Sequence, residues 1–176
     1  WKRYVSLLIF VLLIAPAGLV FAGVAEDSAQ GVALYKVKRY EDALPYLQKA
    51  AEGGDTTAQL YLGNMYREGL GVKKDYAKTI PWFEKAAAAG NPRAQTYLGI
   101  AYSEGLGVEP DYEKAAQWFL KAAEQNHPPA QTLVGVMYYK GMGVEQSFPE
   151  AKKWLEKASA NGERDAQSFL GLIYLD

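Results

Sequence analysis

One short phrase recurs along this chain at a fixed interval, and the interval restricts the folds that the chain can adopt. The phrase centres on a Leu-Gly or Val-Gly pair, and its glycines stand 36 residues apart, at Gly63, Gly99, Gly135 and Gly171. A period between about 20 and 50 residues is typical of stacked repeats, in which each unit buries its apolar face against its neighbours. We therefore expect an array of similar units.

The composition narrows the class of protein further. The chain has 176 residues, of which 49% are hydrophobic and 22% charged, as in a globular protein. The formal net charge of −1 does not favour a nucleic-acid-binding surface, which needs clustered basic residues. The chain contains no cysteine, so disulfides, thiolate metal sites and cysteine nucleophiles are excluded.

The N-terminal segment, residues 1–25, differs from the rest of the chain. A basic start is followed by an apolar run and by small residues, which predicts a secretory signal peptide cleaved after Ala22 or Ala25. The alternative is an uncleaved membrane anchor, because residues 5–25 carry no charge and about 20 apolar residues can span a bilayer. Both interpretations place the repeats outside the cytoplasm, in the periplasm or the secreted space, either free or membrane-anchored.

The recurring phrase divides the remaining chain into units. The predicted boundaries are 26–55 for a divergent first repeat, 56–91, 92–127 and 128–163 for full repeats, and 164–176 for a partial repeat with its first helix only. Apolar residues recur four apart in each unit, as on one face of a helix, which predicts two helices per full repeat. The first ends at Gly-x-Gly-Val, and the second follows a predicted N-cap at Asp75, Asp111 or Ser147.

The 36-residue glycine lies in the middle of each predicted first helix, where Gly costs about 1 kcal/mol relative to Ala. Its repetition predicts a point at which another helix approaches the bare backbone. Two aromatic rows have the same period, and we interpret them as core and not as a stacking platform for sugars or single-stranded DNA. They are Tyr66, Tyr102 and Tyr138 in the first helices and Trp82, Trp118 and Trp154 in the second.

Together these residues form the pattern A-x-x-x-L-G-x-x-Y-x-x-G-x-G-V, followed by A-x-x-W-x-x-K-A-A-x-x-G. The pattern resembles the Sel1-like repeat, a relative of the tetratricopeptide repeat (TPR), over nearly all of residues 26–176. Departures are Thr79, where Ala is usual, and Leu133-Val134, where the two preceding units have Tyr-Leu. The resemblance implies an all-α fold, a right-handed α/α solenoid, that mediates protein–protein interaction in assembling complexes or envelope signalling.

Residues that could carry catalysis are scarce. The Gly-x-Gly pairs follow a helix and lack the third glycine of a dinucleotide fingerprint, so we interpret them as helix-ending turns. His127 is the only histidine, and its Asn-His-Pro-Pro context predicts a surface turn residue and not a metal ligand. Glu68 and Glu104 recur at one repeat position, which we interpret as solvated helix ends. We therefore expect no catalytic, cofactor-binding or metal-binding residues, and a protein that is not an enzyme.

In related two-helix repeats the first helices line a concave groove. Three variable positions per unit face it, located three residues before the mid-helix Gly, one after it and four after it. Transferred to this chain, the predicted groove residues are Ser28, Val32, Tyr35, Leu60, Asn64, Arg67, Thr96, Ile100, Ser103, Thr132, Val136 and Tyr139. Their apolar and polar mixture favours a partner peptide or helix held by apolar contacts with polar edges. The alternative is a groove that is unused because its apolar residues are partly buried.

The sequence thus predicts a non-catalytic protein–protein interaction scaffold of the cell envelope or secreted space. The alternative function is that of an accessory module of an envelope enzyme or polymer-binding protein. The expected partner is a protein or peptide and not a nucleic acid. A membrane is a partner only if the N-terminal segment stays uncleaved.

Overall fold

The computed structural model describes the backbone of residues 17–173 and the side chains of residues 23–173. Within this range every regular element is an α-helix. The helices are α1 (Ala17–Lys36), α2 (Tyr40–Glu52), α3 (Thr56–Glu68), α4 (Tyr76–Ala88), α5 (Pro92–Glu104), α6 (Tyr112–Glu124), α7 (Pro128–Lys140), α8 (Phe148–Ala160) and α9 (Arg164–Ile173). The basic start and most of the apolar run of the predicted signal peptide lie outside the described residues.

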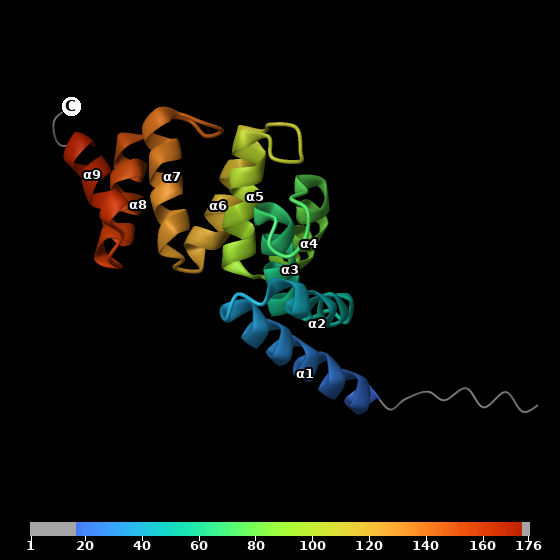
Figure 1. The fold of residues 1–176 in the computed structure, drawn as a ribbon. Coiled ribbons are helices and arrows are strands. Elements are labelled where there is room, and N and C mark those ends of the chain that lie inside the picture. Colours follow the sequence, from blue (N-terminus) through green and yellow to red (C-terminus); the bar gives the residue numbers. More distant parts are fainter. Residues whose placement is uncertain (1–16, 174–176) are drawn as a thin grey trace, which may run out of the picture.

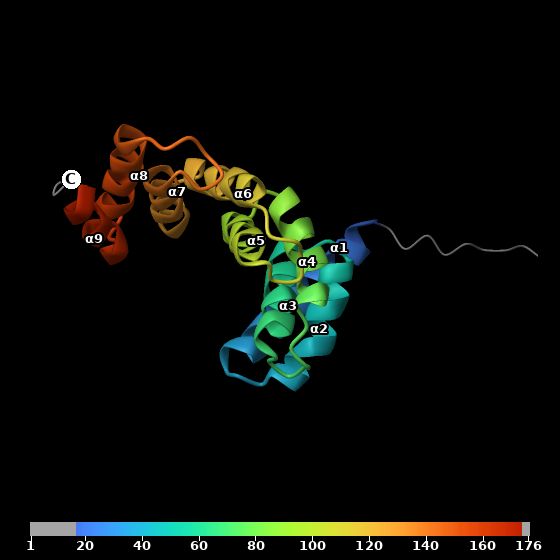
Figure 2. The same ribbon diagram turned by 90° about the horizontal axis from the view of Figure 1, so that it is seen from above.

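The helices form an all-α solenoid in which packing is mainly between elements that are adjacent in sequence (Figure 1). Seen from above, they follow an arc, with α3, α5, α7 and α9 on its inner side and α4, α6 and α8 on its outer side (Figure 2). The first helices of the repeats therefore line the concave side, as expected for two-helix repeats. No helix in residues 17–173 is long and apolar enough to cross a membrane.

The predicted helix starts are confirmed. The carboxylates of Asp75 and Asp111 accept hydrogen bonds from the backbone N–H groups of Lys78 and Lys114, at 3.1 and 2.9 Å. The hydroxyl of Ser147 accepts one from the N–H of Glu150 at 3.4 Å. Each bond satisfies an N–H group that has no partner inside the helix, which is why these residue types fix the starting point.

The mid-helix glycines are points of close approach, as the repeat predicted. A Cβ atom at Gly63 or Gly99 would collide with the ring of Phe83 or Phe119, on the second helix of the same repeat. At Gly135 it would lie 2.6 Å from Cγ of Leu155. The glycine thus lets the two helices of a repeat pack with a large apolar side chain against bare backbone.

The Gly-x-Gly turns join one repeat to the one before it. Gly105 caps α5 in the left-handed conformation with φ 72°, which confirms the interpretation as a helix-ending turn. A Cβ atom on Gly107 would lie 2.7 Å from the carbonyl oxygen of Tyr76, at the start of α4 in the preceding repeat. The second glycine therefore allows the loop to rest on the neighbouring helix, and its φ of 76° would strain other residues.

Both aromatic rows pack against the hydrophobic core, but they are not all fully buried. Trp154 is 8% exposed, while Trp82 and Trp118 are half-buried at the edge of core clusters that consist mainly of Ala, Leu and Phe. Each of these Trp rings is covered by the Lys three residues later, with the ammonium 4.3–4.5 Å from the ring centroid. Cation–π contacts with these lysines thus complete the outer layer of the core.

A row of buried glutamines, which the sequence pattern contained without an assigned role, also links the repeats. Gln95 lies 5% exposed, and its side-chain amide donates a hydrogen bond to the carbonyl oxygen of Ala87 at 3.1 Å. The same bond recurs in the neighbouring repeats, from Gln59 to Ala51 and from Gln131 to Ala123, at 3.2 Å. Each glutamine satisfies a carbonyl near the end of the preceding repeat, so it fixes how consecutive units join.

Candidate interaction groove

Two pockets adjoin on the inner side of the arc. The first has a volume of about 210 Å³ and lies between α3, α4 and α5. The second has a volume of about 300 Å³ and lies between α5 and α7. Tyr97 and Ile100 of α5 line both of them, so these two side chains form a common wall. The pockets are therefore neighbouring parts of one groove across α3, α5 and α7.

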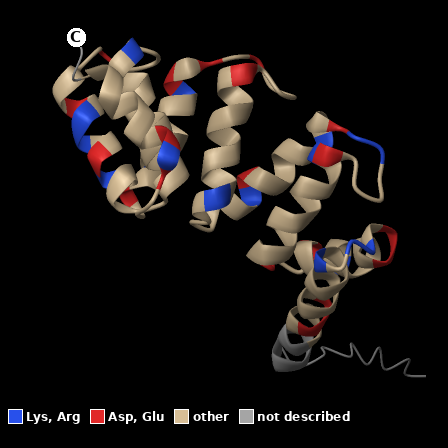
Figure 3. Cartoon of the chain, turned by 60° about the vertical axis from the view of Figure 1, so that its left-hand side comes forward, with Lys and Arg blue, Asp and Glu red and all other residues tan. Residues whose placement is uncertain are grey.

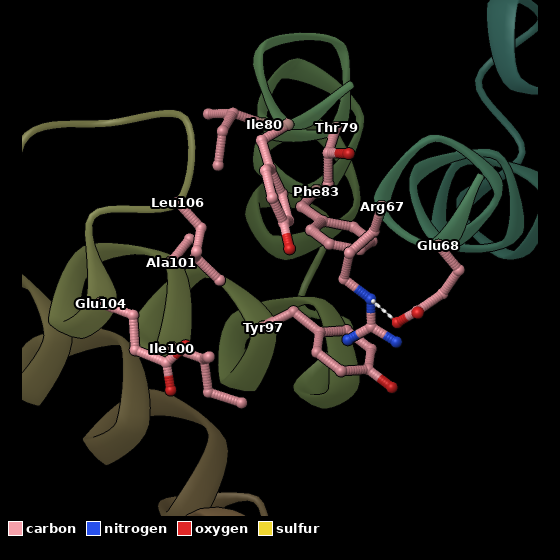
Figure 4. Close-up of a pocket in the computed structure, with 11 residues that line it drawn as sticks. Arg67, Glu68, Thr79, Ile80, Phe83, Tyr97, Ile100, Ala101, Glu104 and Leu106 are labelled. Atoms are coloured by element: carbon pink, nitrogen blue, oxygen red, sulfur yellow. Dashed lines mark ion pairs between the residues drawn. The ribbon is translucent and has the colours of Figure 1, made fainter. Parts of the chain in front are cut away.

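The first pocket contains a fixed stack of side chains (Figure 4). Tyr97 stacks on Phe83 with ring centroids 5.2 Å apart, and the guanidinium carbon of Arg67 lies 4.1 Å from the Tyr97 centroid. Nε of Arg67 also forms an ion pair with a carboxylate oxygen of Glu68 at 2.9 Å. The only basic residue among those predicted for the groove is thus held in place by a ring and a carboxylate.

The second pocket has a different polar character. The hydroxyl of Thr96 donates to the carbonyl oxygen of Pro92 at 2.8 Å and lies 3.1 Å from Nδ1 of His127. Because that hydroxyl proton is already used, Nδ1 of His127 is the donor, and Nε2 of the neutral ring remains a hydrogen-bond acceptor. Burial and the nearby charge of Arg93 lower the pKa of His127 below its usual value, which favours the neutral ring at pH 7.

A third and more open hollow of about 470 Å³ lies along α1. Its lining includes Ser28 and Val32 together with small alanines and Asp55. The Ser28 hydroxyl donates to a carboxylate oxygen of Asp55 at 2.7 Å, and the same oxygen caps α3 by accepting from the N–H of Ala58. The polar groups of this hollow therefore bond mainly to each other.

The predicted groove residues differ in exposure according to their position in the repeat. The position three residues before the glycine is buried in the first four units, with exposed fractions of 4–7%. These residues are Ser28, Leu60, Thr96 and Thr132, and Leu60 belongs to the core around Phe83. Asn64 is also buried, at 6% exposed. The half-buried remainder consists of Val32, Tyr35, Arg67, Ile100, Ser103, Val136 and Tyr139.

The pockets bring together only some of these residues. Arg67 and Ile100 meet in the first pocket, Thr96 and Ile100 in the second, and Ser28 and Val32 in the hollow along α1. The other predicted residues do not line these three spaces. They are Tyr35, Leu60, Asn64, Ser103, Thr132, Val136 and Tyr139.

Sequence reasoning missed the side chain that lies at the centre of the groove. Tyr97 stands two residues before the mid-helix glycine, a position that carries a large side chain in each unit: Tyr61, Tyr97, Leu133 and Phe169. The repeat pattern predicts no binding role for this position, yet Leu133 also lines a pocket. The signal in the sequence was this recurrence of a large side chain at one helix position, which in the structure lies between the buried Thr96 and Leu98.

His127 lies in the turn between repeats, as expected, but it is not a simple surface residue. It is half-buried, it occupies the N-cap position of α7 and it lines the second pocket. Arg93, in the first turn of α5, lines the same pocket. The place of these two residues in the pocket does not follow from the sequence, because His127 stands about 30 residues away from Arg93 and Thr96 along the chain.

The described residues contain no group of three or more His, Asp or Glu side chains that could hold a metal ion. Basic and acidic residues are interspersed over the helices in Figure 3, with no large region of one sign in this view. The groove therefore offers side-chain pockets, hydrogen-bonding groups and a few local charges. That chemistry suits recognition of another molecule.

The comparisons with known proteins assign the family. The sequence model of the Sel1 repeat matches residues 30–55, 56–91, 92–127 and 128–163. The chain belongs to the Sel1 repeat family. The resemblance drawn from the sequence is thereby confirmed, and the helical solenoid agrees with it. Sel1 repeat proteins are generally protein–protein interaction modules, and scaffolds of this kind are typically non-catalytic.

Solved structures of bacterial Sel1 repeat proteins are similar to this one. A Sel1 repeat protein from Oxalobacter formigenes is 35% identical, with a TM-score of 0.80 over 84% of this chain and 59% of its own. A protective antigen of uropathogenic Escherichia coli strains with an SLR fold is also 35% identical, with a TM-score of 0.82. That match covers 86% of this chain and 33% of the antigen. This chain thus spans less than two thirds of the length of either protein.

Cysteine-rich protein B of Helicobacter pylori is 29% identical, with a TM-score of 0.60 over 76% of this chain and 97% of its own. In contrast to that protein's name, the present chain contains no cysteine. Its repeats are therefore held by packing and hydrogen bonds without disulfides. No functionally curated protein matches the chain significantly.

Proposed function

We propose that this Sel1 repeat protein is an interaction scaffold that binds a segment of a partner protein in the groove across α3, α5 and α7. The observation that carries the proposal is the pair of adjoining pockets on the concave side, which share Tyr97 and Ile100. Pockets for small-molecule ligands usually have about 300–1,000 Å³. The first space, of about 210 Å³, lies below that range and the second, of about 300 Å³, at its lower limit, so both suit single side chains of a partner.

The wall between the pockets is suited to recognition because it is ordered before a partner arrives. Phe83 supports one face of Tyr97, and Arg67 contacts its ring as well. A side chain that is already fixed loses little conformational freedom on binding, and Tyr and Arg are enriched among the residues that dominate interface energies. Tyr97 is therefore the expected centre of the interface, with Ile100 as its apolar neighbour.

The groove can be tested with the variant Ile100→Gln, which removes an apolar contact without adding charge. Affinity capture with the whole chain, followed by mass spectrometry, should recover partners whose yield falls about tenfold with this variant. Tyr112→Gln on the outer helix α6 is the matched control, because Tyr112 is 45% exposed and lines neither pocket. Recovery of every partner by Ile100→Gln at the wild-type level would show that the groove is not the site.

We further propose that the repeats function outside the cytoplasm, in the periplasm or as a secreted protein. The support is the basic and apolar N-terminal segment of residues 1–25, which has the organisation of a signal peptide. Fractionation of cells that express the full chain tests this location. Recovery of the protein in the cytoplasmic fraction alone, with its N-terminal segment intact, would contradict it.

A further inference from the structure

Among the residues that line the first pocket, carboxylates outnumber cations. Its lining includes one cation, Arg67, and two carboxylates, Glu68 and Glu104. Arg67 is already neutralised by its ion pair with Glu68. Glu104 is exposed and has no ion-pair partner among the described residues. One uncompensated carboxylate therefore remains beside the apolar floor of the pocket.

Helix ends of both kinds lie at the first pocket. α3 ends at Glu68, α5 ends at Glu104 and α4 begins at Tyr76, so two helix C-termini and one helix N-terminus lie beside the pocket. The last carbonyl groups of a helix carry a partial negative charge, which favours a cation nearby. The N-terminus of α4 offsets one of the two C-termini, so the unpaired carboxylate of Glu104 is the main negative group of the pocket.

The floor of the pocket is apolar and has room for one side chain. Ile80, Phe83 and Tyr97 line it together with Ile100 and Leu106. Figure 4 shows these side chains around the space, with Glu104 at one edge and the Arg67–Glu68 pair at the other. A ligand that fits must place an apolar group on the floor and a positive charge near Glu104.

We propose that the first pocket recognises a basic–apolar element in a partner protein: a large apolar or aromatic side chain with a Lys or Arg next to it in sequence. The apolar side chain lies against Tyr97 and Ile100, and the cation pairs with Glu104. This inference rests on the proposed groove and specifies the chemistry of its partner.

The second pocket differs from the first in its charged residues, so the two ends of the groove favour different parts of a bound segment. Its lining includes Arg93 and His127 and contains no carboxylate, and it lies by the N-terminal ends of α5 and α7. Helix N-termini carry a partial positive charge. An acidic segment is therefore better placed at the second pocket, and a basic one at the first.

Selection of a phage-displayed library of random linear peptides against the whole chain tests the proposal without assuming a natural partner. We expect enriched peptides to carry Lys or Arg beside an aromatic or large aliphatic residue. Their affinities are then measured by fluorescence polarisation with labelled synthetic peptides. Glu104→Lys should weaken binding about fivefold or more, since it replaces attraction with repulsion.

Glu124→Lys is the matched control for the charge. Glu104 is the last residue of α5 and Glu124 the last residue of α6, so both changes add the same charge at a helix C-terminus, and only Glu104 lines the pocket. The affinity for Glu124→Lys should stay within about twofold of wild type. Equal losses for both variants would show that net charge, and not the pocket, attracts the peptides, and would overturn the inference.

The remaining outcomes separate this inference from the proposed groove. Enriched peptides that lack Lys and Arg but lose affinity with Ile100→Gln would overturn the basic–apolar element and leave the groove supported. Enrichment of acidic peptides that lose affinity with Arg93→Glu would also overturn the basic–apolar element and leave the groove supported. It would show that the charged contact is made at the second pocket. Peptides that are insensitive to Ile100→Gln, or an absence of enrichment, would count against both proposals.

Discussion

At the scale of single residues, the contact between Gly99 and Phe119 shows how tightly the two helices of a repeat pack. A Cβ atom at Gly99 would overlap the Phe119 ring, which is 2% exposed and enclosed by the core. We expect Gly99→Ala to destabilise the protein by about 1–3 kcal/mol, the usual cost of overpacking, although Ala is the better helix former. Urea denaturation of the variant and the wild type measures the difference.

Gly171 is the matched control for this substitution, because it holds the same repeat position in α9. A Cβ atom at Gly171 would have no neighbouring atom within 4 Å. Gly171→Ala should stabilise the chain by about 0.4–1 kcal/mol through helix propensity and a less flexible unfolded state. If Gly99→Ala were also stabilising, helix propensity would outweigh close packing, and the explanation for the glycine row would be wrong.

The single histidine makes stability depend on pH in a predictable direction. Burial and the charge of Arg93 lower the pKa of His127, so the unfolded chain binds a proton more readily than the folded one. Stability should therefore fall as the pH drops through the unfolded value near 6.5 towards the lower folded value. Thermal unfolding at about pH 7.5 and about pH 5.5 measures the loss.

His127→Gln isolates this contribution, because an amide does not titrate in that range. The drop in melting temperature between the two pH values should be smaller for His127→Gln than for the wild type. An equal drop in both proteins would assign the pH dependence to carboxylates elsewhere in the chain.

At the scale of helices, the N-caps explain why the first helices begin where they do. The side chain of Asn91 accepts hydrogen bonds from the N–H groups of Arg93 and Ala94 at 3.0 and 3.1 Å, and it starts α5. His127 holds the same position before α7 without a side-chain cap bond. Asn91→Ala should therefore cost about 1 kcal/mol of stability, measured by denaturant unfolding.

The reciprocal change, His127→Asn, provides the comparison at the uncapped helix. It would supply one cap bond, from the N–H of Ala130, because Pro129 has no N–H to donate, and it would lose the contact of His127 with Thr96. A loss of stability as large as that of Asn91→Ala would mean that the Thr96 contact matters more than capping at this site.

The helix ends also show which features of the fold can be predicted from the sequence. The predicted caps at Asp75 and Asp111 and the αL turn at Gly105 are present in the structure. These features are local, because the bonding groups stand within four residues of each other. The exception is α1, which begins at Ala17 and is longer than the other first helices. It runs without interruption through Ala22 and Ala25, the two predicted cleavage points.

At the scale of the whole molecule, the packing of the first repeat distinguishes between those two points. Val24 packs against the core cluster of α2 and α3, and a Cβ atom at Gly53 would collide with it. Cleavage after Ala25 would remove this contact, while cleavage after Ala22 would keep it. We therefore expect a processed protein to begin at Gly23, as measured by intact mass and N-terminal sequencing. A mature terminus at Glu26 would contradict this prediction.

The repeat period, the helices, their caps and the Sel1 family all follow from the sequence, because each depends on residue types at short, regular spacing. Only the tertiary structure brings Arg67, Phe83 and Tyr97 into one stack and places His127 against Thr96. These contacts join residues that are 14 to 31 positions apart, and a repeat pattern assigns the same role to equivalent positions in every unit. The packing of one helix against the next decides which equivalent position lines a pocket and which is buried.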